Sequence, residues 1–302
     1  MPSRIDDGGR MNQPRAVSRP VTRRAVLAGA VTLLAAPRIV RADTPLTFGL
    51  TPVLLDSDIA LLDLMQAYLQ EAMNRPVNLV KRRTYQEITA LLLTGELDAA
   101  WICGFPFVQH WDRLSLIVVP LYHGKPLYQS YIIVPKDRPV TDWHELRGDV
   151  HAFSDPDSNS GHLVTWALLA DAKETPQNFF RQTFYTYGHR NVVRAVASGL
   201  AQSGSVDGYV WDVLSHRDPN LASQTKIIRR SEWLAFPPIA HLKTDPDAEK
   251  IAALTSSLQA AGESAKGREL LGMLELDGFA PEPEALFQPI ADKFALVKGR
   301  ET

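Results

Sequence analysis

The segment FSDPDSNSGH, residues 153–162, contains the side chains best suited to bind a small anion. It lies between a predicted strand and a predicted helix. The first N–H groups of a helix have no acceptor within it, and together with the helix dipole they attract negative charge. The donors of Ser158, Asn159 and Ser160, followed by Gly161, suit a tetrahedral oxyanion. Ser, Asn and Asp are also the usual helix caps, so the pattern equally fits a capped helix without a ligand.

Cys103 is the only cysteine of the chain, which excludes an internal disulfide. It follows a predicted buried strand over 97–102, at the edge where parallel sheets bind ligands. A free cysteine usually packs as a small apolar residue, but a thiolate could bind copper(I) or trivalent arsenic. His162, His189 and Asp212 would complete a metal site, yet no H-x-x-x-H or C-x-x-C spacing supports one. We therefore expect no metal and no cofactor.

A further set of residues lies at the predicted ends of helices or strands and could contact the same ligand. These residues are Tyr85, Tyr131, His189, Trp211 and Asp212. A tyrosine hydroxyl can donate to an oxyanion while its ring covers the site, and an imidazole can donate as well. Asp212 could face a cleft at the start of a helix or simply cap that helix. Trp211 could line the pocket, and packing explains each aromatic residue equally well.

Composition and motifs exclude several classes of function. Lysine plus arginine number 32 and aspartate plus glutamate 34, a formal net charge of -2, so the total does not indicate binding of nucleic acid. SNSGH differs from the G-x-S-x-G motif of α/β hydrolases, and no nucleotide-binding glycine motif follows a predicted strand. Cys103 as a nucleophile with a histidine base has no local support. We predict a monomeric binding protein, not an enzyme.

The elements that position these residues predict an α/β protein of two lobes. Strands alternate with helices, which is typical of parallel sheets with right-handed crossovers. The predicted strands are 46–51, 77–80, 97–102, 115–121, 128–134, 150–154, 183–187, 205–209, 226–229 and 237–241, and the predicted helices are 58–73, 84–93, 161–171, 189–198, 246–261, 262–274 and 283–296. Lobe one then comprises 43–134 plus 237–302, and lobe two comprises 135–236. Two crossings predict a two-strand hinge with a ligand cleft between the lobes.

The N-terminus has the composition of an export signal. Thr22-Arg23-Arg24 precedes an apolar run over 25–36, and Val40-Arg41-Ala42 places small residues at a plausible cleavage site. The paired arginines resemble a twin-arginine signal. The run is too short to span a bilayer core of about 30 Å. We expect residues 1–42 to be a signal peptide cleaved near Ala42, which makes the mature protein periplasmic; a tail with a short buried helix is the alternative.

Several stretches, in order along the chain, resemble the PhnD-like family, the periplasmic phosphonate, phosphite and phosphate binding components of ABC transporters. The strand-SDPDSNSG-helix segment resembles the family's S-D-P-x-S-x-S-G loop. FGLTP at 48–52, LLTGELDAAWICG at 92–104 and YGHRNVVRAVASGLAQSGSVD at 187–207 resemble its other landmarks. The resemblance covers nearly all of residues 45–290.

The resemblance implies a type II periplasmic binding protein fold that closes about a hinge, with an oxyanion at the loop of Ser158 to Ser160. It implies capture of a phosphonate, phosphite or phosphate for an ABC permease. His189 falls on the family's G-x-H position, and Asp207 and Asp212 lie near the place where the family's phosphonate binders carry acidic residues that meet an aminoalkyl group. Arsenite-sensing members of the family are similar, so the alternative is an oxyanion sensor that uses Cys103 and signals to the periplasmic domain of a membrane histidine kinase.

Overall fold

The computed structural model of the chain describes residues 44–51, 59–244 and 247–299. Residues 43–302 form one compact unit, distinct from residues 1–42. The predicted signal peptide and its cleavage site therefore lie outside the described residues. None of the helices within the described ranges is long and apolar enough to cross a membrane.

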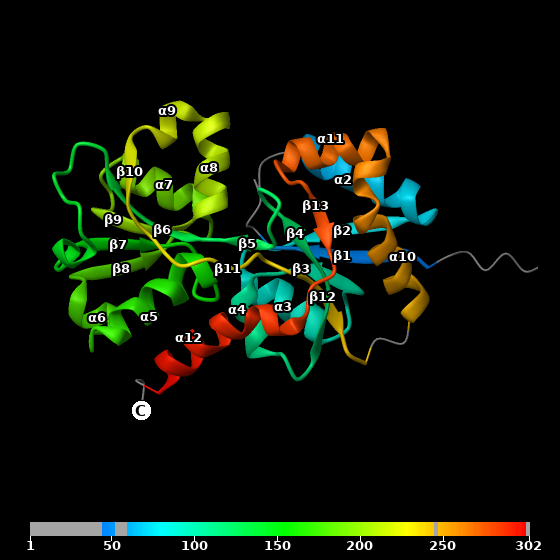
Figure 1. Cartoon of the computed structure of the whole chain (residues 1–302), viewed down its shortest axis with the longest axis horizontal. Helices are drawn as coiled ribbons and strands as arrows, with labels where there is room; N and C mark the ends of the chain where they lie inside the picture. The colour runs from blue at the N-terminus through cyan, green and yellow to red at the C-terminus, as the bar shows by residue number, and fades with distance from the viewer. Residues whose placement is uncertain (1–43, 52–58, 245–246, 300–302) are drawn as a thin grey trace, which may run out of the picture. The chain divides into compact units, whose positions relative to one another are not determined.

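A six-stranded mixed sheet forms the centre of lobe one, with strand order β13-β4-β12-β3-β1-β2 (Figure 1). Its strands are β1 (Leu46–Leu50), β2 (Val77–Lys81), β3 (Ala99–Trp101), β4 (Leu114–Leu121), β12 (Ile239–Leu242) and β13 (Gly278–Ala280). β1 pairs in parallel with β2 and β3, whereas β12 runs antiparallel between β3 and β4. Helices α2 (Ile59–Met73) and α3 (Tyr85–Leu93) are the predicted crossovers. β3 is buried along its whole length, as expected of a central strand covered on both faces.

A five-stranded sheet forms lobe two, with strand order β10-β6-β9-β7-β8. Its strands are β6 (Ser130–Pro135), β7 (Val150–Phe153), β8 (Gln182–Tyr185), β9 (Ser203–Asp207) and β10 (Thr225–Arg230). β6 pairs antiparallel with β9 and β10, so the prediction that residues 130–134 belong to lobe one is wrong. A short apolar run suits the centre of either sheet, and only its pairing partners decide its place.

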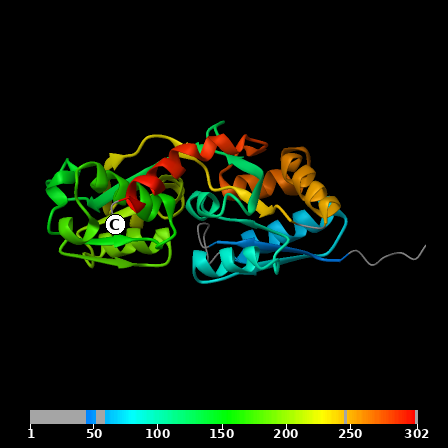
Figure 2. The same cartoon turned by 90° about the horizontal axis from the view of Figure 1, so that it is seen from below.

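Two strands and one helix connect the lobes. β5 (Leu127–Tyr128) and β11 (Leu234–Ala235) pair antiparallel where the chain crosses in each direction, as predicted for a two-strand hinge. Helix α12 (Gln288–Lys298) contacts both α4 (Gly104–Gln109) of lobe one and α5 (Val164–Asp171) of lobe two. Figures 1 and 2 show α12, in red, passing from one lobe to the other. The larger cluster of buried hydrophobic side chains includes residues of both lobes and of this connection.

The remaining helices cover the two sheets. They are α6 (Pro176–Phe179), α7 (His189–Ala197), α8 (Gly208–Arg217) and α9 (Pro219–Ala222) in lobe two, and α10 (Ala248–Gln259) and α11 (Ala265–Leu274) in lobe one, with 3-10 turns at 143–146, 261–263 and 284–287. β13 was not predicted from the sequence, because its three residues are too few to show a period. The π-helical turn over Asn159–Leu163, which precedes α5, was not predicted either.

Candidate functional site

Polar residues from both lobes meet near the carboxyl ends of β3, β7 and β9, and we name this group the interlobe cluster. Its members are buried, and they are Tyr85, Cys103, Tyr128, Asp155, Ser158, Asn159, Ser160, Gly161, His189 and Asp207. Tyr85 and Cys103 come from lobe one, at the starts of α3 and α4. The structure therefore brings together Tyr85, Cys103, His189 and the loop over 158–161, which the sequence analysis selected separately.

The loop after β7 is held by a serine cap and by a close glycine contact. Ser158 caps the π-helical turn, because its Oγ accepts a hydrogen bond from the N–H of Gly161 at 2.9 Å. A Cβ on Gly161 would lie 1.9 Å from Ser154 Oγ, so only glycine allows this close approach. Ser158 is thus a helix cap. Its hydroxyl hydrogen remains available as a donor.

Cys103 joins the two lobes through its sulfur atom. Sγ accepts a hydrogen bond from the N–H of Asn159 at 3.2 Å, a donor expected from the sequence to face an anion. Burial raises the pKa of this thiol to about 12, so it is uncharged at neutral pH. In the part of the chain that the structure describes, no group of three or more His, Cys, Asp or Glu side chains could hold a metal ion. The thiol acts here as an interlobe contact.

Two hydrogen bonds link Asp207, His189 and Tyr85. The backbone N–H of Asp207 donates to His189 Nδ1 at 3.0 Å, and His189 Nε2 lies 3.2 Å from Tyr85 Oη. Because Nδ1 accepts, the proton of the neutral imidazole is on Nε2, and Nε2–H donates to the tyrosine oxygen. Burial lowers the pKa of His189 to about 3, which keeps the ring uncharged. The phenol proton of Tyr85 is then left to donate to another acceptor.

The carboxamide of Asn159 is only partly satisfied. Its Nδ2 donates to Tyr128 Oη at 2.9 Å, while its buried Oδ1 has no hydrogen-bond partner among the described residues. An unpaired polar atom of this kind costs about 1–3 kcal/mol. Tyr128 Oη is the acceptor in this bond, so it also retains its own proton to donate. A ligand that both donates and accepts hydrogen bonds would satisfy these groups.

Two buried carboxyl groups border the loop. Asp207 caps α8 and accepts a hydrogen bond from Ser160 Oγ at 3.3 Å. Asp155 of lobe two accepts from the N–H of Tyr85 of lobe one at 3.3 Å. Burial raises the pKa of Asp207 to about 7 and that of Asp155 to about 6. The cluster therefore has acidic groups on two sides of the loop.

Asp155 and Tyr128 were not among the site residues predicted from the sequence. Asp155 lies within the SDPDSNSG segment. A carboxylate repels an anion, so its type does not suggest a place in an anion site, and its role as the acceptor for the N–H of Tyr85 at the start of α3 is visible only in the structure. Tyr128 lies inside a predicted strand, where the sequence gives no indication that its hydroxyl contacts Asn159 of the next lobe. Asp155 lies three residues before Ser158, and Tyr128 lies three residues before Tyr131. This proximity to predicted site residues is the sequence feature that could have indicated them.

Tyr131, Trp211 and Asp212 form a second group beside the cluster. Asp212 Oδ2 accepts from Tyr131 Oη at 3.1 Å and from Tyr122 Oη of lobe one at 3.4 Å. Asp207 caps α8, so the prediction that Asp212 lies at a helix start is wrong. Trp211 packs edge-on against Tyr131 and donates from Nε1 to a hydroxyl of β10 at 3.1 Å, which agrees with the packing alternative.

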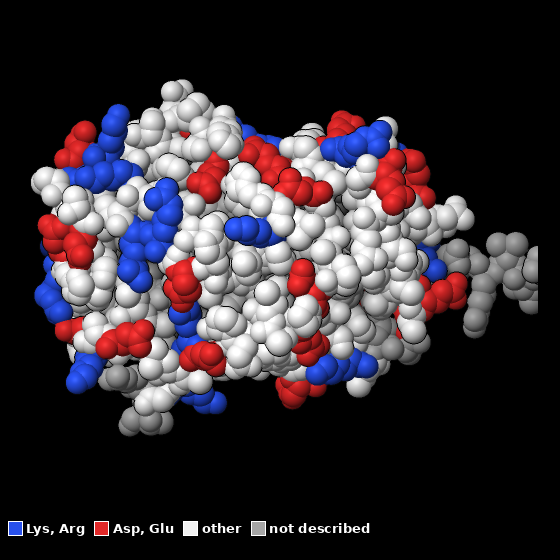
Figure 3. Space-filling model, viewed as in Figure 1, with Lys and Arg blue, Asp and Glu red and all other residues white. Residues whose placement is uncertain are grey.

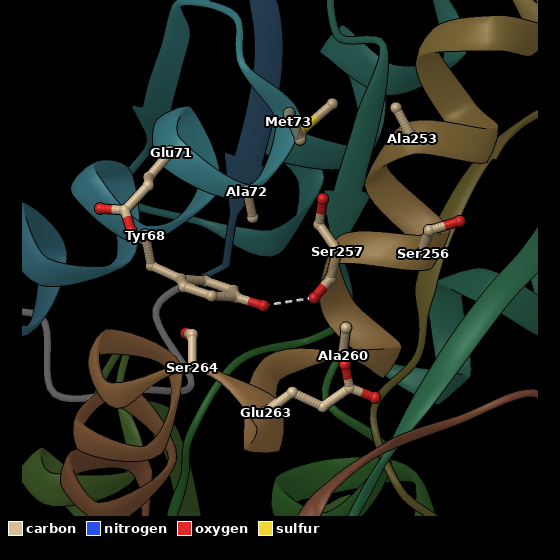
Figure 4. Close-up of a pocket in the computed structure, with 10 residues that line it drawn as sticks. All are labelled: Tyr68, Glu71, Ala72, Met73, Ala253, Ser256, Ser257, Ala260, Glu263 and Ser264. Carbon is tan, nitrogen blue, oxygen red and sulfur yellow. Dashed lines mark hydrogen bonds between the residues drawn. The ribbon is translucent and has the colours of Figure 1, made fainter.

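A separate pocket of about 530 Å³ lies within lobe one, between α2, α10 and the start of α11 (Figure 4). Its lining residues are Tyr68, Glu71, Ala72, Met73, Ala253, Ser256, Ser257, Ala260, Glu263 and Ser264. Tyr68 donates to the carbonyl of Ser257, Glu71 pairs with Lys266, and Ser264 caps α11. Because these polar groups already have partners, the pocket offers fewer groups to a polar ligand than the interlobe cluster does.

Comparison with known proteins identifies the relatives of this chain. The family model described as the periplasmic substrate-binding protein of phosphonate ABC transporters matches residues 48–285. A binding protein component of an ABC phosphonate transporter from Pseudomonas aeruginosa has a similar structure, with a TM-score of 0.77 and 18% identity over 85% of this chain and 87% of that chain. PhnD1 from Prochlorococcus marinus in complex with methylphosphonate has a TM-score of 0.75 and 16% identity over 84% and 98%.

A histidine kinase sensor domain with similarity to periplasmic binding proteins is less similar. Its TM-score is 0.53 at 14% identity, over 80% of this chain and 99% of that chain. At these identities the likenesses concern the fold, which is the two-lobed fold of periplasmic binding proteins.

Proposed function

Since this chain belongs to the family of periplasmic substrate-binding proteins of phosphonate ABC transporters, we propose that it binds a small phosphorus oxyanion in the interlobe cluster and delivers it to a membrane permease. The observation that carries the proposal is the position of the Ser158–Gly161 loop. The loop begins a helix in lobe two and touches lobe one through the 3.2 Å contact of Asn159 N with Cys103 Sγ. An anion held there would contact both lobes.

The donors for the oxyanion come from lobe one, lobe two and the hinge. Tyr85 of lobe one and Tyr128 of the hinge each retain a phenol proton, because each oxygen is the acceptor in its observed bond. Ser158 of lobe two retains its hydroxyl hydrogen for the same reason. Each hydrogen bond to a charged group contributes about 1.5–3 kcal/mol. A ligand that receives bonds from both lobes stabilises the closed arrangement relative to an open one.

The substituent of the ligand would lie toward the second polar group. PhnD1 of Prochlorococcus marinus is described with methylphosphonate, whose methyl group carries no hydrogen-bonding atom. Asp212 lies beyond the cluster with Tyr131 and Tyr122 as donors, and the guanidinium of Arg230 lies 4.9 Å from the Tyr131 ring. An amino substituent on an alkylphosphonate would find its carboxylate partner in Asp212.

Residues 1–42 would direct export and be removed near Ala42, so that the mature monomer meets its ABC permease in the periplasm. The sensor alternative is not favoured, because the matching family description names a transporter component. The Cys103 thiol is also neutral and already bonded to Asn159, whereas coordination of a soft ion requires a thiolate.

Isothermal titration calorimetry with methylphosphonate, phosphite and phosphate tests the proposed function. Replacing both Ser158 and Ser160 by alanine should weaken binding by about 2–3 kcal/mol, since the Ser158 hydroxyl is lost as a donor to the charged ligand and the hydrogen bond from Ser160 to Asp207, which holds the loop, is lost with it. The matched control is Ser256→Ala on α10, whose hydroxyl donates to the carbonyl of Ala252 in the same helix. Wild-type protein that binds none of the three anions would refute the function, and an unchanged affinity of the double variant would remove the loop from the site.

A further inference from the structure

The interlobe cluster contains carboxyl groups and neutral hydrogen-bond donors but no lysine or arginine. This composition disfavours a ligand with two negative charges. We propose that the site binds its oxyanion in the singly charged, protonated form, with the P–O–H group donating to Asn159 Oδ1, and that it excludes the dianion. The proposal rests on the proposed function of the same site and adds which ionic form is bound.

Positive side chains lie elsewhere. Among the described residues, no lysine or arginine makes a hydrogen bond or an ion pair with a member of the cluster. Lys250 is buried, but it pairs with Asp98 at 2.7 Å inside lobe one. Arg230 lies over the Tyr131 ring and faces Asp212 in the second group. The site therefore has no fixed positive charge to neutralise a second negative charge on the ligand.

The histidines do not supply that charge either. His189 accepts at Nδ1 from the N–H of Asp207, and burial lowers its pKa to about 3. His162, which follows the loop, has Nδ1 at 2.7 Å from the carbonyl oxygen of Pro156, and burial lowers its pKa to about 4. Both rings remain neutral over the pH range in which a phosphonate loses its second proton.

Acidic groups face the loop from both flanks. Asp155 lies between the loop and α3, and Asp207 lies between the loop and α8. Asp157 and Asp212 are the next carboxyl groups on the two sides, and the tyrosines and Cys103 are neutral. Burying a dianion beside these carboxyl groups without a counter-ion would be costly, because unpaired buried charges are strongly disfavoured. A monoanion halves the charge to be buried.

The hydrogen-bonding groups fit the monoanion as well. Asn159 Oδ1 is buried and has no partner among the described residues, so it needs a donor. Of the groups on the monoanion of methylphosphonate, only P–O–H can donate, while the bare oxygens accept from Tyr85, Tyr128 and Ser158. The dianion of methylphosphonate or of phosphite has no P–O–H group and would leave Asn159 Oδ1 unsatisfied.

The charged side chains on the face drawn in Figure 3 do not make this selection. Figure 3 shows acidic and basic side chains interspersed on the face that it presents. Such a mixture does not attract one charge form of a small anion over another at ionic strengths where screening acts within about 10 Å. We assign the discrimination between a monoanion and a dianion to the buried cluster.

Calorimetric titration of the mature chain with methylphosphonate and with phosphite, from about pH 5.5 to pH 8.5, tests the proposal. Above the second pKa of each ligand, Kd should rise by a further factor of about ten per pH unit, because each unit costs about 1.4 kcal/mol in the population of the bound form. Ionisation of Asp155 and Asp207, whose pKa values burial raises to about 6 and about 7, adds a pH dependence that is the same for both ligands. The two breaks should fall at different pH values, each at the ligand's own pKa. Above the break, binding measured in buffers of different ionisation enthalpy should take up one proton per ligand.

Two variants separate the ligand's proton from protons of the protein. Asp207→Asn removes one of the two buried carboxyl groups that titrate in this pH range, the other being Asp155, and should keep the break at each ligand's own pKa. Asn159→Ala removes the proposed acceptor and should raise Kd at low pH about fivefold or more, from the loss of about 1 kcal/mol or more. Asn220→Ala, on the exposed side of α9, is the matched control and should leave Kd unchanged.

If the pH dependence of Kd is the same for both ligands, with no break at either ligand's own pKa, or if the breaks vanish in Asp207→Asn, the proton belongs to the protein and the inference is overturned. Binding that is insensitive to pH through the ligand's second pKa would also overturn it and leave the proposed function intact. Failure of the wild-type chain to bind either anion at any pH would overturn both.

Discussion

Replacing Tyr85 by phenylalanine removes the phenol hydroxyl, which the hydrogen bond from His189 leaves free to donate its proton to a ligand. Nε2–H of His189 occupies the Tyr85 oxygen, so the phenol proton is the group that would reach the oxyanion. Loss of one hydrogen bond to a charged group costs about 1.5–3 kcal/mol. At about 1.4 kcal/mol per factor of ten, Kd for methylphosphonate should rise roughly 10- to 150-fold.

The same substitution should also destabilise the fold. His189 is fully buried, and without the tyrosine oxygen its Nε2–H has lost its acceptor. A buried donor without a partner costs about 1–3 kcal/mol. For a chain of this size, that corresponds to a fall in Tm of several degrees, at about 2–4 °C per kcal/mol.

Calorimetry and thermal melting together separate the two effects. Tyr68→Phe is the matched control, because Tyr68 is also buried and donates to a carbonyl, that of Ser257 in the separate pocket of lobe one. Both variants should lose stability, and only Tyr85→Phe should lose affinity. If Kd of Tyr85→Phe stays within about twofold of the wild-type value, the tautomer argument and the role of the phenol proton are both wrong.

Two more substitutions test the burial and the packing of the loop. Because burial raises the pKa of Asp207 from 3.8 to about 7, its stabilising contribution is full below about pH 4 and is lost as the pH rises to about 7. Asp207→Asn should therefore gain Tm relative to wild type between about pH 5 and pH 8, and an equal difference at both pH values would contradict the assigned burial. Gly161→Ala should lower the free energy of unfolding by about 1–3 kcal/mol and weaken ligand binding, because the added Cβ would lie 1.9 Å from Ser154 Oγ and 3.0 Å from His189 Cε1. Gly272→Ala on α11, where an added Cβ meets nothing within 4 Å, should not lower it. Urea unfolding measures both variants, and an equal loss in the two would show that the close contact at Gly161 is not the cause.

Local sequence patterns predicted most of the secondary structure of the described chain. β1, β2 and β3 alternate with α2 and α3 as expected, since each has a period or a cap that acts over a few residues. The Thr84 cap of α3 and the Ser158 cap of the loop are examples that neighbouring residues specify alone. The resemblance of the SDPDSNSG segment to the PhnD-like family extended these local patterns to the correct fold and family.

The places where prediction was wrong depend on partners far along the chain. Residues 130–134 belong to lobe two because β6 pairs with β9 and β10. The sequence of an apolar run does not indicate which strands it will pair with. Asp212 lies within α8 because Asp207, five residues earlier, caps the helix. Aspartate is a favourable N-cap at either position, so the residue type does not decide which of the two caps the helix. The structure shows that the cap is Asp207.

The residue types by themselves determined that the loop before the helix contains cap residues, that Cys103 has no internal disulfide partner and that the chain lacks the motifs of common enzymes. Only the tertiary structure decided that Asn159 N meets the Cys103 sulfur and that Tyr85 meets His189, across sequence separations of 56 and 104 residues. Only the tertiary structure placed Asp155 and Asp207 beside the loop without a cation. The net charge of a buried site depends on groups from several helices, strands and loops. A local sequence pattern does not indicate which of these elements come together in the fold.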